Sequence, residues 1–186
     1  MNLNLKMKSK ILTLFFFLSI IQTSFSQKFD LGIKSGSNFA TQNIKSISGT
    51  KSITGLHLGA FAYIKLPLVF GIQPELQYSM QGTKINSTTI RSIDYLNIPV
   101  LVRSSFGPIN IHFGPQFGML TGAINEISGI PTDIKDKLLK RDFSLVLGLS
   151  VEPVDRFIFS GRYVKGLKNI SDDVPFANDT KNITFQ

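Results

Sequence analysis

Charged side chains recur at alternate positions within otherwise apolar stretches of this sequence. Lys34, Glu75, Arg103, Asp142 and Arg162 each fall on the polar side of such a stretch. If that side is enclosed, its charges must pair, because an unpaired buried charge is very costly. We interpret these residues as a structural ion-pair network, with a path for protons or ions as the alternative. The same sides also carry Asp30, His57, Lys65 and Glu152.

Combinations of residues that could catalyse a reaction or bind a metal are scarce. A serine hydrolase needs a histidine that is held by an acid beside the nucleophile. The two histidines, His57 and His112, lie in separate stretches on the polar side, so we interpret them as hydrogen-bonded interior residues. Two histidines in separate strands also make a weak metal site. We therefore expect no enzymatic activity, no cofactor and no metal ion.

A further group of candidate residues is basic and lies in or beside a polar connecting segment. It comprises Lys137, Lys140 and Arg141. Ammonium and guanidinium groups at the edge of a membrane can pair with lipid phosphates. The alternative is that these side chains are merely solvated, and the sequence leaves both interpretations open.

The alternating pattern itself predicts β-strands. In the stretch 70–81, the even positions are apolar or weakly polar, and the odd positions are glycine, glutamine, glutamate or serine. A strand separates these two sets onto opposite faces, whereas a helix would mix them. Similar runs predict eight strands, at about 28–39, 53–66, 69–82, 93–106, 109–121, 141–152, 156–168 and 180–186.

Each predicted strand has a side expected to contact lipid and a side expected to face an interior. Glycines at 71, 114, 118 and 148 fall on the polar side, which suits a narrow barrel whose side chains crowd the lumen. We expect Glu75, Gln116 and Arg162 to face that lumen. The residues expected to face lipid are Phe70, Ile72, Leu76, Phe113, Phe117, Leu145 and Leu147.

Short and long connections alternate along the chain. Tight turns are predicted around Pro67, at Gly107-Pro108 and at 153–155, where turn-forming residues occur. Long polar links are predicted at 40–52, 83–92, 122–140 and 169–179, with a short helix within 132–141. Short turns at one end and long loops at the other are typical of outer-membrane barrels, whose long loops face outward.

Strand length points to the same fold. The predicted strands reach about 12–15 residues, whereas ~9–11 tilted residues suffice to cross a membrane and soluble strands average ~5–6. We therefore predict an all-β, eight-stranded, antiparallel, up-and-down transmembrane barrel. Side chains fill the interior of a barrel of this size, so an open pore is not expected. A soluble lipocalin-like ligand-binding barrel is the structural alternative.

The N-terminus predicts export. Lys6, Lys8 and Lys10 precede an apolar run at 11–21, and small residues at Ser24 and Ser26 fit cleavage before Gln27. Eleven apolar residues are too few for a membrane-spanning helix, which needs ~20. We therefore predict a signal peptide at 1–26 and a barrel domain at 27–186. The formal net charge of +8 can suggest nucleic-acid binding, but an exported protein rarely meets nucleic acid.

Two features need explanation in a closed barrel. Pro74, Pro99 and Pro115 lie within predicted strands, and since proline cannot donate to a strand ladder, each should sit at a bulge or lose one hydrogen bond. The last strand, 181–186, has six residues and spans roughly 20 Å at ~3.3 Å per residue. We expect this strand to be truncated and the natural chain to continue beyond Gln186.

Several of these segments resemble the PorT-like outer-membrane β-barrel proteins. The similar segments are 70–82 (FGIQPELQYSMQG), 95–102 (YLNIPVLV), 113–120 (FGPQFGML), 31–39 (LGIKSGSNF) and 161–170 (GRYVKGLKNI). The resemblance implies an eight-stranded barrel in the bacterial outer membrane and implies no chemistry, although a few such proteins serve protein secretion.

The sequence thus favours a structural or interaction role through the long extracellular loops. The alternative is a subunit of an outer-membrane secretion or transport machinery. We expect a monomeric barrel in contact with outer-membrane lipid, with other cell-envelope proteins as candidate partners.

Overall fold

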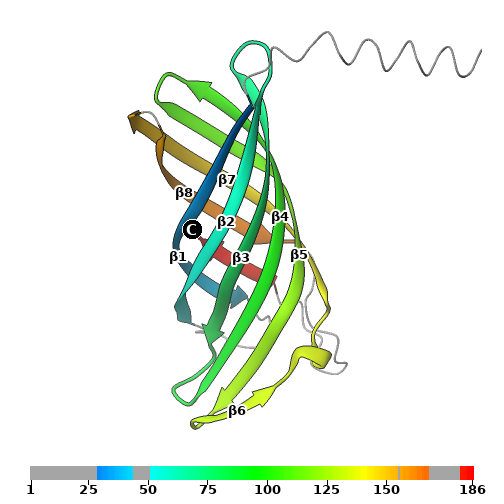
Figure 1. Cartoon of the computed structure of the whole chain (residues 1–186). Coiled ribbons are helices and arrows are strands. Elements are labelled where there is room, and N and C mark those ends of the chain that lie inside the picture. The colour runs from blue at the N-terminus through cyan, green and yellow to red at the C-terminus, as the bar shows by residue number, and fades with distance from the viewer. Residues whose placement is uncertain (1–28, 44–50, 155, 168–180) are drawn as a thin grey trace, which may run out of the picture.

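The alternating stretches form antiparallel strands in the computed structural model, which describes residues 29–43, 51–154, 156–167 and 181–186. The connections between strands are short on one side of the molecule and longer on the other (Figure 1). No helix in the described ranges is long and apolar enough to span a membrane. The elements are β1 (Phe29–Asn43), β2 (Lys51–Lys65), β3 (Phe70–Lys84), β4 (Thr89–Phe106), β5 (Ile109–Ile127), β6 (Ile130–Asp133), the 3-10 helix η1 (Lys135–Lys137), β7 (Arg141–Val154), β8 (Phe157–Gly166) and β9 (Lys181–Phe185).

The strands close into a ring. Their order is β4-β3-β2-β1-β9-β8-β7-β5-β6, and a further pairing of β4 with β5 joins the two ends. Eight strands make the wall, whereas β6 pairs with β5 only at 124–127, beyond the stretch that pairs with β7. The predicted eight-stranded antiparallel barrel is confirmed, and β6 is a ninth strand that the sequence did not predict. The last wall strand, β9, pairs with β1 over Phe39–Asn43 and with β8 over Tyr163–Lys165.

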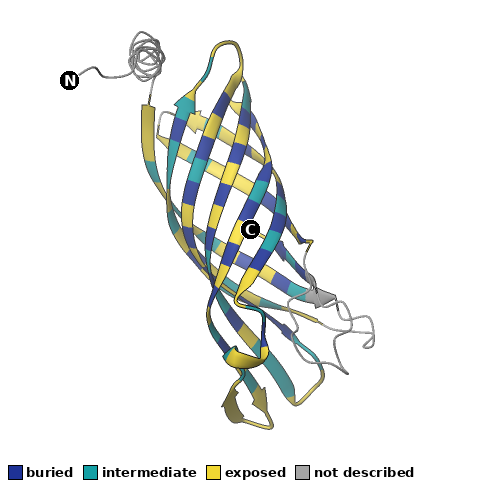
Figure 2. Cartoon of the chain, turned by 90° about the vertical axis from the view of Figure 1, so that its right-hand side faces the viewer, coloured by how far each residue is buried: buried dark blue, intermediate teal, exposed yellow. Residues whose placement is uncertain are grey.

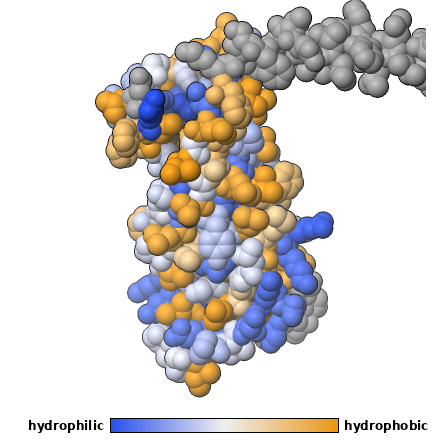
Figure 3. All heavy atoms as spheres, viewed as in Figure 1, coloured by the Kyte–Doolittle hydropathy of each residue, from blue (hydrophilic) through white to orange (hydrophobic). Residues whose placement is uncertain are grey.

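Burial alternates along the strands (Figure 2). In β3 the residues at odd positions, such as Gln73, Glu75 and Gln77, are buried, whereas Phe70 and Leu76 are exposed. The polar side chains therefore face the interior and the large apolar ones face outward, which is the reverse of a soluble barrel. Apolar side chains extend over the outer surface, and hydrophilic ones are more frequent toward the end that holds β6 (Figure 3).

The predicted facing of the strands is confirmed. Glu75, Gln116 and Arg162 are buried in the interior. The residues predicted to face lipid lie on the outer side, with Leu145 half-buried and the others exposed; they are Phe70, Ile72, Leu76, Phe113, Phe117, Leu145 and Leu147.

Aromatic side chains border the apolar band on both sides. Toward the β6 end, Phe39 is the cross-strand partner of Phe185, whose ring centroid lies 5.0 Å from that of Tyr163. Phe117 and Phe143 form a second pair at 5.1 Å. Near the short turns the outward aromatic residues include Phe29, Phe70, Phe106, Phe157 and Phe159. Two such girdles are typical of the interfaces of a membrane-spanning barrel.

Two of the predicted long links are largely strand. The expected loop at 83–92 is reduced to a turn at 85–88, because β3 extends to Lys84 and β4 starts at Thr89. In the link 122–140, β5 continues to Ile127 and turns at Ser128-Gly129, where both residues have positive φ. The helix expected within 132–141 is a single turn, η1, since so short a segment cannot sustain a helix alone. The other two predicted long loops lie largely outside the described residues, as does the predicted signal peptide.

The mid-strand prolines keep the register of the sheet. Pro74 pairs with Val100, and Pro99 pairs with Gln116, without a shift. A bulge at these prolines was one of two alternatives, and the structure supports the other, the loss of a ladder hydrogen bond. A register shift occurs instead where Asp94 pairs with Gly122 but Tyr95 pairs with Leu120. Thr121 is thus the extra residue of a β-bulge, and its hydroxyl donates to the Asp94 carbonyl at 3.0 Å.

Candidate functional site in the barrel lumen

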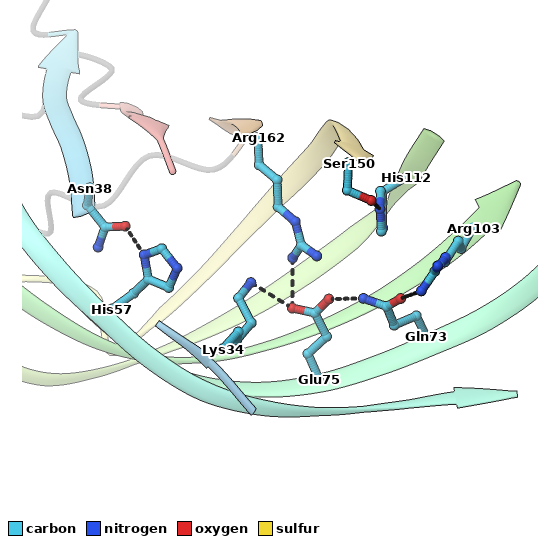
Figure 4. Close-up of polar contacts among 9 residues, drawn as sticks. All are labelled: Lys34, Asn38, His57, Gln73, Glu75, Arg103, His112, Ser150 and Arg162. Atoms are coloured by element: carbon cyan, nitrogen blue, oxygen red, sulfur yellow. Dashed lines mark hydrogen bonds and ion pairs between the residues drawn. The ribbon is translucent and has the colours of Figure 1, made fainter. Parts of the chain in front are cut away.

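Glu75 on β3 is the centre of an ion-pair cluster inside the barrel (Figure 4). Its Oε2 accepts from Lys34 Nζ of β1 at 3.0 Å and from Arg162 Nη1 of β8 at 2.7 Å. Its Oε1 accepts from Gln73 Nε2 at 2.8 Å. The carboxylate therefore receives three donors, two of them charged, and its side chain is fully buried.

This cluster ties opposite parts of the wall together. In the ring, β3 and β8 are not neighbours, so the contact between Arg162 and Glu75 crosses the lumen rather than following the sheet. Desolvation offsets much of the attraction within a buried ion pair, but removal of one partner leaves an uncompensated charge. The cluster is thus a structural restraint that tolerates little change.

Arg103 on β4 extends the cluster toward the short-turn end. Its Nη1 donates to Gln73 Oε1 at 3.4 Å, a long contact, and its Nη2 donates to Glu152 at 3.1 Å. The guanidinium also lies 4.5 Å from the centroid of the Tyr63 ring, within the range of a cation–π interaction. Gly71 makes room for that ring, because a Cβ there would lie 2.3 Å from Tyr63.

Both histidines are hydrogen-bonded inside the barrel, as the sequence predicted. Nδ1 of His57 lies 2.8 Å from Asn38 Oδ1, and the Asn38 amide donates to Ser79 Oγ at 2.8 Å. Nε2 of His112 lies 2.8 Å from Ser150 Oγ. Within the described part of the chain, no three His, Asp or Glu residues come together as metal ligands.

The position of Asp142 differs from the predicted five-residue network. It lies in a second polar group, in which Asn182 Nδ2 donates to Asp142 Oδ2 and to the Tyr95 hydroxyl, both at 3.3 Å. Asp142 precedes Gly148, the cross-strand partner of Arg162, by six residues on β7, which is roughly 20 Å along a strand. Alternation correctly predicted the face on which Asp142 lies, but it carries no information on height within the barrel.

Two members of the Glu75 cluster were not predicted from the sequence. Gln73 bridges Glu75 and Arg103, and Tyr63 covers the Arg103 guanidinium. The spacing of Gln73 two residues before Glu75 was a usable signal, since such residues share a face of a strand. Nothing in the sequence indicated the contact between Tyr63 and Arg103, which depends on strand register.

Comparison with known proteins decides the family. Residues 22–172 match the family described as outer membrane protein beta-barrel domain. The chain belongs to this family. It is therefore located in the bacterial outer membrane, and its apolar band contacts membrane lipid. No curated protein sequence matches the chain.

Two solved structures share the fold of this outer-membrane barrel. Neisserial surface protein A (NspA) is similar with a TM-score of 0.60 and 8% identity, covering 85% of this chain and 94% of NspA. Ail, the attachment invasion locus protein of Yersinia pestis, is similar with a TM-score of 0.51 and 15% identity, covering 83% of this chain and 92% of Ail. At these identities the likeness concerns the fold alone.

A buried apolar cluster lies at the β6 end of this outer-membrane barrel. Ile93 and Tyr95 of β4, Leu120 and Ala123 of β5, and Leu138 after η1 form a buried cluster, against which Ile134 packs. The segment that follows β6 is therefore folded back onto the barrel. Deeper in the lumen, Leu101, Val146 and Val164 form a second buried cluster. Side chains thus fill the lumen at several levels.

The three predicted lipid-contact residues lie at the rim. Lys137 ends η1, Lys140 follows shortly after, and Arg141 begins β7. All three are exposed, and the contact of Lys140 with Asp136 is a long 4.0 Å on an open surface, where such pairs contribute little. Arg141 precedes the girdle residue Phe143 by two positions and shares its side of β7. It therefore lies just beyond the apolar band.

Proposed function

We propose that this outer-membrane barrel is a filled anchor for an interaction surface on the cell exterior. The observation that carries the proposal is the extension of β4 and β5, which have 18 and 19 residues. Since ~9–11 residues cross the membrane, this hairpin continues well beyond the apolar band, and β6 widens it (Figure 1). The short turns lie at the opposite end, and long connections in such barrels face outward.

The extension is built as an ordered platform. Leu138 and Ile134 pack against its base, so buried apolar contacts hold the connection to β7 against the extended strands. At its tip, Ile127 is 52% exposed and Ile130 is 70% exposed. These two residues are cross-strand partners, and adjoining exposed apolar side chains, unlike single ones, are a feature of surfaces that bind another molecule.

The filled lumen supports an anchoring role over a conducting one. Ion pairs and hydrogen bonds cross the barrel around Glu75, and a buried apolar cluster lies toward its outer end. The proposal therefore includes neither a transported substrate nor a catalytic step. Within the family, we also infer that the chain belongs with the PorT-like barrels that it resembles, and that it works as a monomer. A subunit of a secretion machinery remains the rival, and the experiment below separates the two.

Site-specific photo-crosslinking in native outer membranes tests the proposed surface. We expect a photoreactive residue at Ile130 to give adducts with an envelope or surface component. The matched control is Leu68, which is 86% exposed in a short turn at the opposite end. Adducts with secretion components from Leu68 but none from Ile130 would favour the machinery subunit, and an absence of adducts at Ile130 would contradict the proposed surface.

The basic rim is proposed to bind lipid phosphates. A cation near an anionic membrane surface contributes about 1 kcal/mol, which is about fivefold in affinity. We expect Lys140→Gln/Arg141→Gln to weaken binding of anionic lipid about 25-fold in a fluorescence titration, and addition of Lys137→Gln to weaken it further. Lys65→Gln/Arg156→Gln removes two exposed cations at the other end and should leave binding of lipid phosphates at the outer rim unaltered. Equal losses in the two doubles would mean that only net charge matters.

A further inference from the structure

One row of interior residues is rich in basic groups. Arg103 of β4 pairs with His112 of β5, which pairs with Gly148 of β7, which in turn pairs with Arg162 of β8. Cross-strand partners share a face, so all four positions face the lumen at adjacent points of the wall. Figure 4 shows the side chains of Arg103, His112 and Arg162. Gly148 leaves space that the Arg162 side chain enters, since a Cβ there would lie 2.7 Å from Arg162 Cγ.

The charges around this row do not balance. Three cations, Lys34, Arg103 and Arg162, contact two carboxylates, Glu75 and Glu152, which leaves one positive charge in excess. Glu75 is shared by Lys34 and Arg162. Three other charged residues on the lumen side of the strands do not correct the excess. Asp142 lies roughly 20 Å along β7 from Gly148, and Asp30 and Lys65 are exposed at the end of the barrel.

The row also presents hydrogen-bond donors that have no acceptor among the described residues. They are Arg103 Nε, Arg162 Nε and Nδ2 of the neighbouring Asn110, and the unpartnered His112 Nδ1 joins them in the tautomer that carries its proton there. Each of these residues is at least nine-tenths buried. When the Ser150 hydroxyl donates to His112 Nε2, Nδ1 of the neutral ring carries the proton. Buried donors without acceptors are costly, and each of these groups requires a hydrogen-bond acceptor.

We propose that the lumen binds one small monovalent anion, of which chloride is the representative, between Arg103, His112 and Arg162. A single negative charge balances the single excess cation, and an anion accepts from several N–H donors at once. A monatomic ion suits an interior that side chains otherwise fill. Water could accept the same hydrogen bonds but would leave the excess charge uncompensated, and a cation would increase it.

Thermal unfolding of the folded protein in detergent tests the site. With sodium gluconate replaced by sodium chloride at constant ionic strength, we expect the midpoint to rise saturably. The rise should reach at least about 5 °C at a chloride concentration 100-fold above the dissociation constant. Crystals grown in bromide should show an anomalous-scattering peak bounded by Arg103, His112 and Arg162.

The matched variants are Asn110→Asp and Asn97→Asp. Asn110→Asp adds a carboxylate beside the basic row, so it should remove the response to chloride. Asn97→Asp makes the same chemical change at another buried amide with an unpartnered Nδ2, six residues from Arg103 on β4 or roughly 20 Å away. It should keep the chloride response.

Equal midpoints in chloride and gluconate, or a chloride response that persists in Asn110→Asp, would overturn the proposal. If Asn110→Asp does not fold, the bromide peak in the unaltered protein decides the question. A peak elsewhere or no peak would equally reject the site.

Discussion

Replacement of Glu75 by glutamine is expected to destabilise the barrel by about 3–5 kcal/mol, which is typical when a buried ion pair loses one partner. The variant would leave the partly buried Lys34 and the buried Arg162 without the carboxylate that they share. The free energy of unfolding, measured by urea titration of the folded protein in lipid vesicles, gives the change directly.

Glu152→Gln provides the control for this prediction. It also removes one carboxylate from a lumen arginine, but the Glu152 side chain is 36% exposed, so water can solvate the Arg103 guanidinium. We expect Glu152→Gln to lower the free energy of unfolding by less than half as much as Glu75→Gln does. Similar costs for the two variants would show that the Glu75 cluster is not the main electrostatic restraint.

The second large effect is expected at a glycine where two strands approach closely. A Cβ on Gly114 would lie 2.2 Å from the Val100 carbonyl oxygen and 2.9 Å from Leu101 Cα. Both are backbone atoms of β4, so no side-chain rotation can relieve the contact, and β4 and β5 would have to separate. We expect Gly114→Ala to lower the free energy of unfolding by at least about 3 kcal/mol, which is the upper range for overpacking, or to prevent folding.

Gly161→Ala is the matched control, since no atom lies within 4 Å of its Cβ position. The shift of the folded barrel on a gel run without heating reports both variants. Gly161→Ala should give the normal folded band, whereas Gly114→Ala should give little or none. A normal folded band for Gly114→Ala would mean that β4 and β5 can adjust more than their spacing indicates.

The wall of the barrel was predictable from the sequence for one physical reason. A barrel strand faces lipid on one side and a crowded lumen on the other, so its apolar and polar residues must alternate. The side on which Phe70, Glu75 and Arg162 lie therefore followed from their positions in the sequence alone. Outside the apolar band the strands no longer contact lipid, so their residues need not alternate between apolar and polar. The polar, β-branched residues around Thr83 and Thr89 therefore resembled a loop although they continue the strands.

The candidate site was predictable only in part. Alternation selected Lys34, Glu75 and Arg162 as interior charges, and the structure brings these three together. Alternation could not show that Asp142 lies apart from these three residues. The height of a residue in a tilted strand depends on the register of each strand that lies between it and the others. The bridging amide of Gln73 and the partners of His57 and His112 likewise depend on which strands meet across the lumen.

The bulge at Thr121 divides β5 into two segments with opposite alternation of buried and exposed residues. Before it, even-numbered residues such as Gln116 and Gly118 face the lumen; after it, the odd-numbered Ala123 is the buried one. One extra residue therefore exchanges the two sides of the strand where the membrane ends. In the outer segment, Ala123 belongs to the buried apolar cluster, whereas Ile124 and Ile127 face outward. Deletion of Thr121 would remove the bulge and leave Ala123 opposite Ile93 on the buried side, so that the two segments would alternate as one continuous strand.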